Sequence, residues 1–95
     1  MKVQFNGTIF TWRGSSPYFF VTVPTDESDY LKSISATVTY DWGMIPVTAQ
    51  VGGTVWTTSL FPKYGRYLLP LEDKVPKAER LVEGAEMLVR LEVPG

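Results

Sequence analysis

Three side chains that could bind an anion lie together in one short segment of the chain. Lys63, Tyr64 and Arg66 follow a Phe-Pro step and surround a glycine, a composition typical of a loop between strands. Loops on a rigid scaffold often carry binding residues, and an arginine beside an aromatic ring can hold a carboxylate, a phosphate or a flat ring. We also expect Arg13 to approach from another loop. The same residues suit an ordinary solvent-exposed hairpin tip, so both interpretations stay open.

Three hydroxyl groups precede that loop, on Thr57, Thr58 and Ser59. They could bind a phosphate or another polar ligand, or they could satisfy backbone groups at a bulge. No base stands near them in the sequence, so none of them is predicted to act as a nucleophile. The candidate binding residues selected from this stretch are Trp56, Thr58, Lys63, Tyr64 and Arg66.

The tryptophans have two possible roles. Trp12, Trp42 and Trp56 could line a ligand pocket, but in so short a chain their large rings also suit the core and the ends of a barrel. Trp42 stands beside Gly43 in a tight turn, so we expect it to be partly exposed.

The composition removes the commonest catalytic groups. The 95 residues include no histidine and no cysteine, which excludes a Ser-His-Asp triad, a thiolate nucleophile, a disulfide and the usual zinc ligands. We therefore expect no enzyme activity, no metal and no cofactor, and we name no catalytic residue. An enzyme that uses Tyr, Lys or Arg without histidine remains an alternative.

The charge balance argues against two classes of partner. Nine basic residues stand against 10 acidic ones, a net charge of −1, whereas nucleic-acid binders usually carry a basic surplus or stripe. A nucleic-acid-binding barrel is therefore a disfavoured alternative. The apolar runs are strand-sized, far below the ~20 residues of a membrane helix, and no signal peptide is visible, so we expect a soluble cytoplasmic protein with no membrane partner.

Alternation of polar and apolar residues predicts mostly strands. Gly52-Gly53 stands between two alternating runs, where a two-residue hairpin turn needs positive φ. Pro46 lacks a backbone donor, so its strand should lie at an edge or contain a bulge. The predicted strands cover residues 3–12, 18–23, 35–41, 44–51, 54–61, 66–71 and 86–93, and the predicted helices begin at Thr25 and cover 73–81.

Large side chains on both faces of several predicted strands favour a barrel over a one-sided sheet. We predict a mainly β fold, a small closed or nearly closed β-barrel of about seven strands with two short helices, as a single domain over residues 1–95. Its core is predicted to contain Phe5, Ile9, Phe20, Val38, Val55, Leu69, Leu88 and Leu91.

Four segments of the chain resemble one known family. They are 41–47 (DWGMIPV), 51–54 (VGGT), 56–62 (WTTSLFP) and 65–71 (GRYLLPL). With these motifs the chain, from Phe5 to Val93, is similar to the bacterial and archaeal domain-of-unknown-function family 1905. The resemblance implies a small β-barrel domain, sometimes fused to or found near a bacteriocin-protection-type domain, with no established activity and no agreed catalytic residues.

These observations favour a non-enzymatic β-barrel module that binds through a loop-lined end of the barrel. The ligand would be a small anionic or aromatic molecule, or a partner protein. The binding surface should combine Trp56 or Tyr64 with Lys63 or Arg66, where aromatic and cationic groups coincide.

Overall fold

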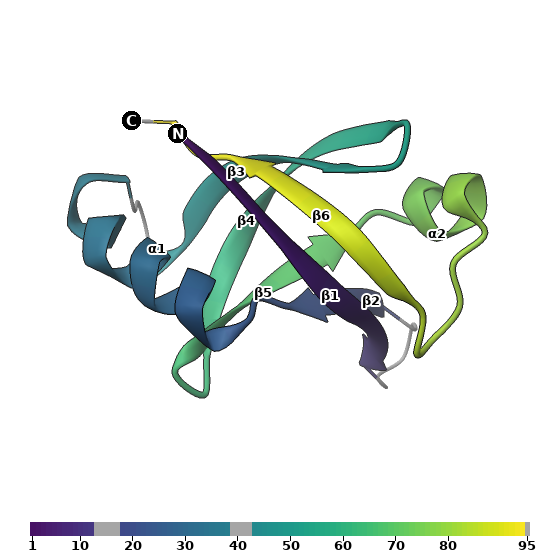
Figure 1. Ribbon diagram of the computed structural model, residues 1–95, viewed down its shortest axis with the longest axis horizontal. Coiled ribbons are helices and arrows are strands. Elements are labelled where there is room, and N and C mark those ends of the chain that lie inside the picture. The colour runs from purple at the N-terminus through teal and green to yellow at the C-terminus, as the bar shows by residue number, and fades with distance from the viewer. Residues whose placement is uncertain (13–17, 39–42, 95) are drawn as a thin grey trace.

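Six strands and two helices form the described part of the chain, residues 1–12, 18–38 and 43–94 of a computed structural model. The strands are β1 (Lys2–Trp12), β2 (Tyr18–Thr22), β3 (Ile45–Val51), β4 (Thr54–Lys63), β5 (Arg66–Leu71) and β6 (Glu86–Glu92), and the helices are α1 (Thr25–Val38) and α2 (Lys74–Glu79). The strands close into an antiparallel barrel in the order β1-β2-β5-β4-β3-β6, with the helices on opposite sides (Figure 1). The predicted mainly β barrel with two short helices is confirmed.

One long strand, β1, belongs to both halves of the barrel. Its first part pairs with β6, and its last part, from Ile9 onward, pairs with β2. Gly7 lies just before this change of partner, and a Cβ atom there would lie 2.3 Å from Cγ1 of Val21. A glycine at position 7 therefore leaves the space that the Val21 side chain fills inside the barrel.

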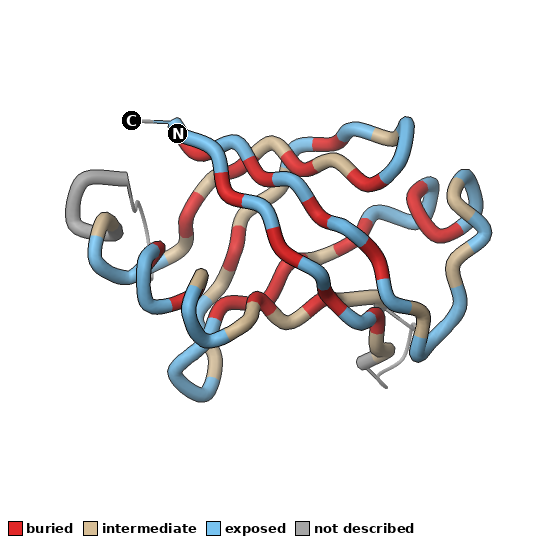
Figure 2. Tube along the Cα trace, in the orientation of Figure 1, coloured by how far each residue is buried: buried red, intermediate tan, exposed pale blue. Residues whose placement is uncertain are grey.

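Alternate residues of each strand fill the barrel interior, as Figure 2 shows along β1 and β6. The alternation is strict on β6, where every second residue is buried, because successive side chains of a strand point to opposite faces. Four residues predicted for the core, Phe5, Ile9, Leu69 and Leu91, are buried in it.

Three other residues predicted for the core lie elsewhere. Val55 is 50% exposed, Leu88 is 41% exposed, and Phe20 is only half-buried. Val55 points outward because its neighbour Trp56 takes the inward position on β4. Leu88 cannot share a face of β6 with Leu91, three residues away, since strand faces repeat every second residue.

The strand predicted from residue 35 is wrong in its first part. The helix α1 continues through Val38, so the barrel has six strands rather than about seven. Ala36 and Val38 alternate with threonine as in a strand, but Leu31, Ile34 and Val38 also fit helical spacing, and the helix that begins at Thr25 prevails. Residues 39–41 and the side chain of Val38 lie outside the described part of the chain.

Each helix is anchored to the barrel by a fully buried side chain, Leu31 in α1 and Val75 in α2. The hydroxyl of Ser28, also buried, donates to the carbonyl of Val23 (2.9 Å) and accepts from the N–H of Tyr67 (3.2 Å), which ties α1 to β5. The helix predicted over residues 73–81 is confirmed as α2. Neither described helix has the length and apolar composition needed to cross a membrane.

The β3–β4 hairpin turns at Gly52-Gly53 as predicted, and Gly52 has a φ of 57°. A Cβ atom at Gly52 would lie 1.9 Å from Oε1 of Glu79, and the Thr54 hydroxyl donates to Oε2 of the same carboxylate at 2.6 Å. The tip of this hairpin is therefore docked on α2. Pro46 lies beyond the three residue pairs that join β3 to β6, which confirms its predicted edge position.

Candidate functional site

The predicted loop around Lys63, Tyr64 and Arg66 is the tip of the β4–β5 hairpin. Lys63 and Arg66 form the last strand pair, and Tyr64-Gly65 makes the two-residue turn between them. Both turn residues have positive φ, 52° and 75°, as a type I′ turn requires. Tyrosine rarely adopts this conformation, yet Tyr64 is 93% exposed to solvent. The fold gains no packing from a tyrosine at this position.

Two cations flank this exposed ring. Nζ of Lys63 lies 5.4 Å from the centroid of the Tyr64 ring, within the range of a cation–π contact. Arg66 is exposed. Among the described residues the ion pair is between Lys74 and Glu72, at 3.7 Å, and Arg66 takes no part in it. The guanidinium of Arg66 is thus available for a planar anion.

A groove of about 400 Å³ lies beside this hairpin tip. It is on the outer wall of the barrel, because Phe10 and Leu68 each stand next to residues that face the core. The strand pairings place β2 between β1 and β5 at this wall. We call this hollow the tip groove, and its lining residues are Phe10, Thr22, Lys63, Tyr64, Arg66 and Leu68.

Three aromatic rings contact one another on one side of the tip groove. The rings of Phe10 and Phe20 stack with centroids 5.8 Å apart, and Phe20 meets Phe61 edge-on at 5.6 Å. All three rings are half-buried, while Leu68 beside them is 6% exposed although it lies outside the core cluster. The outer wall therefore carries a small apolar cluster of its own, directly beside the cationic tip.

Two of the predicted binding residues lie apart from the tip groove. Trp56 is 3% exposed, and its indole Nε1–H donates to the carbonyl of Pro70 at 3.1 Å, so its ring is part of the core. Thr58 is half-buried opposite Val47 and lines a different hollow that also contains Pro94. The structure brings together Lys63, Tyr64 and Arg66 and separates them from Trp56 and Thr58.

Three groove residues were missed in the sequence, namely Phe10, Thr22 and Leu68. The alternation on β1 does place Phe10 on the face opposite Ile9, which is a signal for an outward aromatic ring. Their proximity to the hairpin tip depends on strand pairing that no local pattern reveals. Arg13, Trp42 and the side chain of Trp12 lie outside the described residues.

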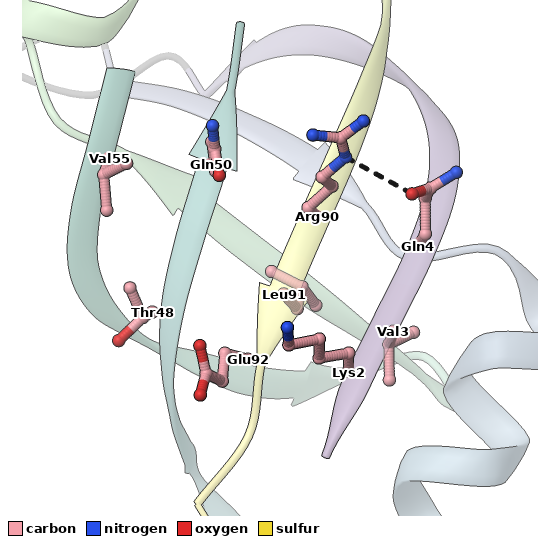
Figure 3. A pocket seen from close by; sticks show the side chains of 9 residues that line it. All are labelled: Lys2, Val3, Gln4, Thr48, Gln50, Val55, Arg90, Leu91 and Glu92. Carbon is pink, nitrogen blue, oxygen red and sulfur yellow. Dashed lines mark hydrogen bonds between the residues drawn. The ribbon is translucent and has the colours of Figure 1, made fainter. Parts of the chain in front are cut away.

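A second groove, of about 370 Å³, crosses the outer face of β1, β6 and β3 (Figure 3). Strand register aligns Gln4, Arg90 and Gln50 in one row across it. The Arg90 Nε–H donates to Oε1 of Gln4 at 3.3 Å, and Glu92 and Lys2 face each other in the next row. Charges of both signs alternate here in solvent, as on an ordinary polar sheet face.

The described residues contain no cluster of side chains that could hold a metal ion. No group of three or more metal-ligating side chains converges within residues 1–12, 18–38 and 43–94. The tip groove holds two cations and a phenol, and the described residues that line it include no carboxylate. The chemistry available at the tip groove is therefore attraction of an anion and contact with a flat apolar surface.

A family model described as a domain of unknown function, DUF1905, matches residues 5–91. The chain belongs to the DUF1905 family. The resemblance noted in the sequence is thereby confirmed, and no curated protein matches the chain. All residues that line the tip groove fall within the DUF1905 match, whereas Lys2, Gln4 and Glu92 of the second groove fall outside it.

Proposed function

We propose that this DUF1905 domain is a non-catalytic binding module that holds a small anionic aromatic molecule in the tip groove. The observation that carries the proposal is Tyr64, a residue that is 93% exposed and has a backbone conformation that tyrosine disfavours. Residues held in such conformations without a packing reason are typical of functional sites. The size of the groove, about 400 Å³, suits a small molecule better than the broad surface of a protein.

Each groove residue has a distinct part in this proposal. Arg66 supplies a planar pair of donors for a carboxylate or phosphate, and Lys63 adds a second positive charge beside the Tyr64 ring. The ring of the ligand lies against Phe10 and Leu68, and Tyr64 covers it from the solvent side. Such a site, open to water, is expected to bind with micromolar to millimolar affinity, about −4 to −8 kcal/mol.

The proposal is tested by NMR titration of the ¹⁵N-labelled protein with 2-naphthoate. Two matched probes separate the contributions: 2-naphthamide keeps the ring without the charge, and cyclohexanecarboxylate keeps the charge without the aromatic ring. We expect shifts of the amides of residues 63–66 and of Phe10, Thr22 and Leu68, strongest with 2-naphthoate. Equal responses to all three probes, or shifts scattered over the barrel, would reject the tip groove as a ligand site.

A further inference from the structure

The strand β6 has one backbone edge that is only partly covered. It pairs with β1 along its full length, from Glu86 to Glu92, but it pairs with β3 only over its last three residues, Arg90 to Glu92. The remainder of β6, on the side of β3, is not paired with any strand of the described chain.

The hydrogen bonds at the two ends of the β1–β6 ladder show which backbone groups face this edge. Met1 and Val93 bond reciprocally, at 3.2 and 2.8 Å, and the N–H of Ile9 donates to the carbonyl of Ala85 at 2.9 Å. Because antiparallel pairs alternate, the odd-numbered residues of β6 bond to β1 and the even-numbered ones face β3. The N–H and C=O groups of Leu88 and Glu86 therefore point to the side of β6 on which β3 no longer pairs with it.

The hairpin tip of β3 is held away from these groups. In the β3–β6 register, Gly52 would be the next partner, opposite Leu88. Its carbonyl instead accepts from Nε2 of Gln50 at 3.1 Å, and the tip is docked on Glu79. Figure 1 shows this tip on the same side of the molecule as α2. The divergence is thus fixed by specific contacts, and it leaves the β6 edge open.

A slot of about 310 Å³ lies between the hairpin tip and β6. Leu88, 41% exposed, forms an apolar part of its wall, and the acidic side chain of Glu86 is exposed two residues further along the strand. Gln50 and Arg90, both labelled in Figure 3, close the end where the two strands join. The slot is lined by Gln50, Val51, Gly52, Met87, Leu88 and Arg90.

We propose that this edge of β6 binds an extended peptide segment as an added antiparallel strand. Unpaired N–H and C=O groups at strand spacing are a template for another strand, and peptide recognition by strand addition uses such main-chain bonds. The side chains specify the guest further: an apolar residue opposite Leu88 and, two residues later, a basic residue opposite Glu86. This site is separate from the tip groove and does not depend on the function proposed for it.

The probe is the peptide acetyl-Thr-Val-Thr-Lys-Thr-amide, added to the ¹⁵N-labelled protein. In the free protein the amide of Leu88 should exchange with solvent as an open amide does, while the amide of Val89, bonded to β1, is protected. Saturating peptide should slow exchange at Leu88 by about tenfold or more. It should shift amides near residues 86–90 and 50–52, and it should leave the tip groove unchanged.

The matched control is the same peptide with the valine nitrogen methylated, which removes one main-chain donor and keeps every side chain. It should not protect Leu88. In the protein, Leu88→Pro removes the donor on the open edge, so the peptide should no longer shift the amides of residues 50–52. If that variant does not fold, Glu86→Lys provides a second comparison, with a several-fold loss of affinity for the lysine peptide.

Four outcomes of the peptide experiment would each overturn the proposal, and a fifth comes from varying the protein concentration. They are slow exchange of Leu88 in the free protein at low concentration, no response to the peptide, shifts located elsewhere, and equal binding of the methylated peptide. Protection of Leu88 that rises with protein concentration would show that a second copy of the chain covers the edge, and it would overturn the proposal as well.

Discussion

The two hairpins that share β4 have turns of the same length and opposite surroundings. At the β3–β4 tip, Gly52 lies against the Glu79 carboxylate, which a side chain at position 52 would have to displace. At the β4–β5 tip, Gly65 has open space around it, and the other turn residue is the exposed Tyr64. The first tip is shaped by packing against a helix. The second has no packing partner to explain its tyrosine, which is why we assign a ligand to it.

The largest expected effect tests the packing at the first tip. Gly52→Ala should lower the free energy of unfolding by about 2 to 3 kcal/mol, because it adds left-handed strain and displaces the Glu79 carboxylate. Gly65→Ala adds the same strain without a contact and should cost about 1 kcal/mol. Urea unfolding of both variants measures the difference. Equal losses would show that the two tips are alike and that the contact with α2 contributes little.

The next effect concerns the second tip and its ligand. Arg66→Lys should weaken 2-naphthoate binding by about tenfold although the charge is kept, because lysine cannot present two parallel donors. Arg80→Lys, at an exposed position in the turn after α2, is the control and should leave the affinity unchanged. NMR titration measures both dissociation constants. If Arg66→Lys binds as the wild type does, the guanidinium is an ordinary surface charge.

A smaller effect separates stability from binding at Tyr64. Tyr64→Asn should raise the free energy of unfolding by about 0.5 to 1 kcal/mol, since asparagine tolerates positive φ at this turn position better than tyrosine does. The same variant should bind 2-naphthoate less well. Thermal unfolding and titration of one preparation give both quantities. A loss of stability would mean that the tyrosine ring packs on the fold and would remove the main argument for a ligand.

The smallest effects compare two polar contacts of α2. Thr54→Val removes the partly buried hydrogen bond to Glu79 and should cost about 1 kcal/mol. Glu72→Gln breaks the ion pair with Lys74. The side chains of Lys74 and Glu72 are 57% and 50% exposed, so the loss should cost less than about 0.5 kcal/mol. Urea unfolding of both variants ranks them. The reverse order would show that the hydrogen bond from Thr54 to Glu79 contributes less to stability than the surface ion pair at the start of α2.

Local patterns in the sequence were sufficient for most of the fold. The Gly52-Gly53 turn and the edge position of Pro46 each depend on a few neighbouring residues, and each was predicted correctly. The extent of α1 was not, because the residues up to Val38 fit both a strand and a helix. The choice between them depends on contacts with the barrel, which a short window of sequence does not contain.

The candidate site also could be predicted only where its residues are close together in the sequence. Lys63, Tyr64 and Arg66 could be grouped in advance because a two-residue turn keeps them together. Phe10 and Leu68 come from strands far apart in the chain, and β2 lies between those strands. Their place in the groove could therefore be predicted only after the pairing of β1, β2 and β5 was known. Trp56 was named both for the binding surface and for the core, and it takes the core position, because one step along β4 moves a side chain from one face of the strand to the other.

The reciprocal bonds between Met1 and Val93 bring residues 1 and 93 side by side at one end of the ladder (Figure 1). A short linker between residues 1 and 94 would therefore close the backbone into a ring without crossing the barrel. New ends could then be opened at Tyr64-Gly65, where the backbone is exposed and the strands on either side pair with other neighbours. In such a circular permutant the order of the strands along the chain changes while every strand pair is retained.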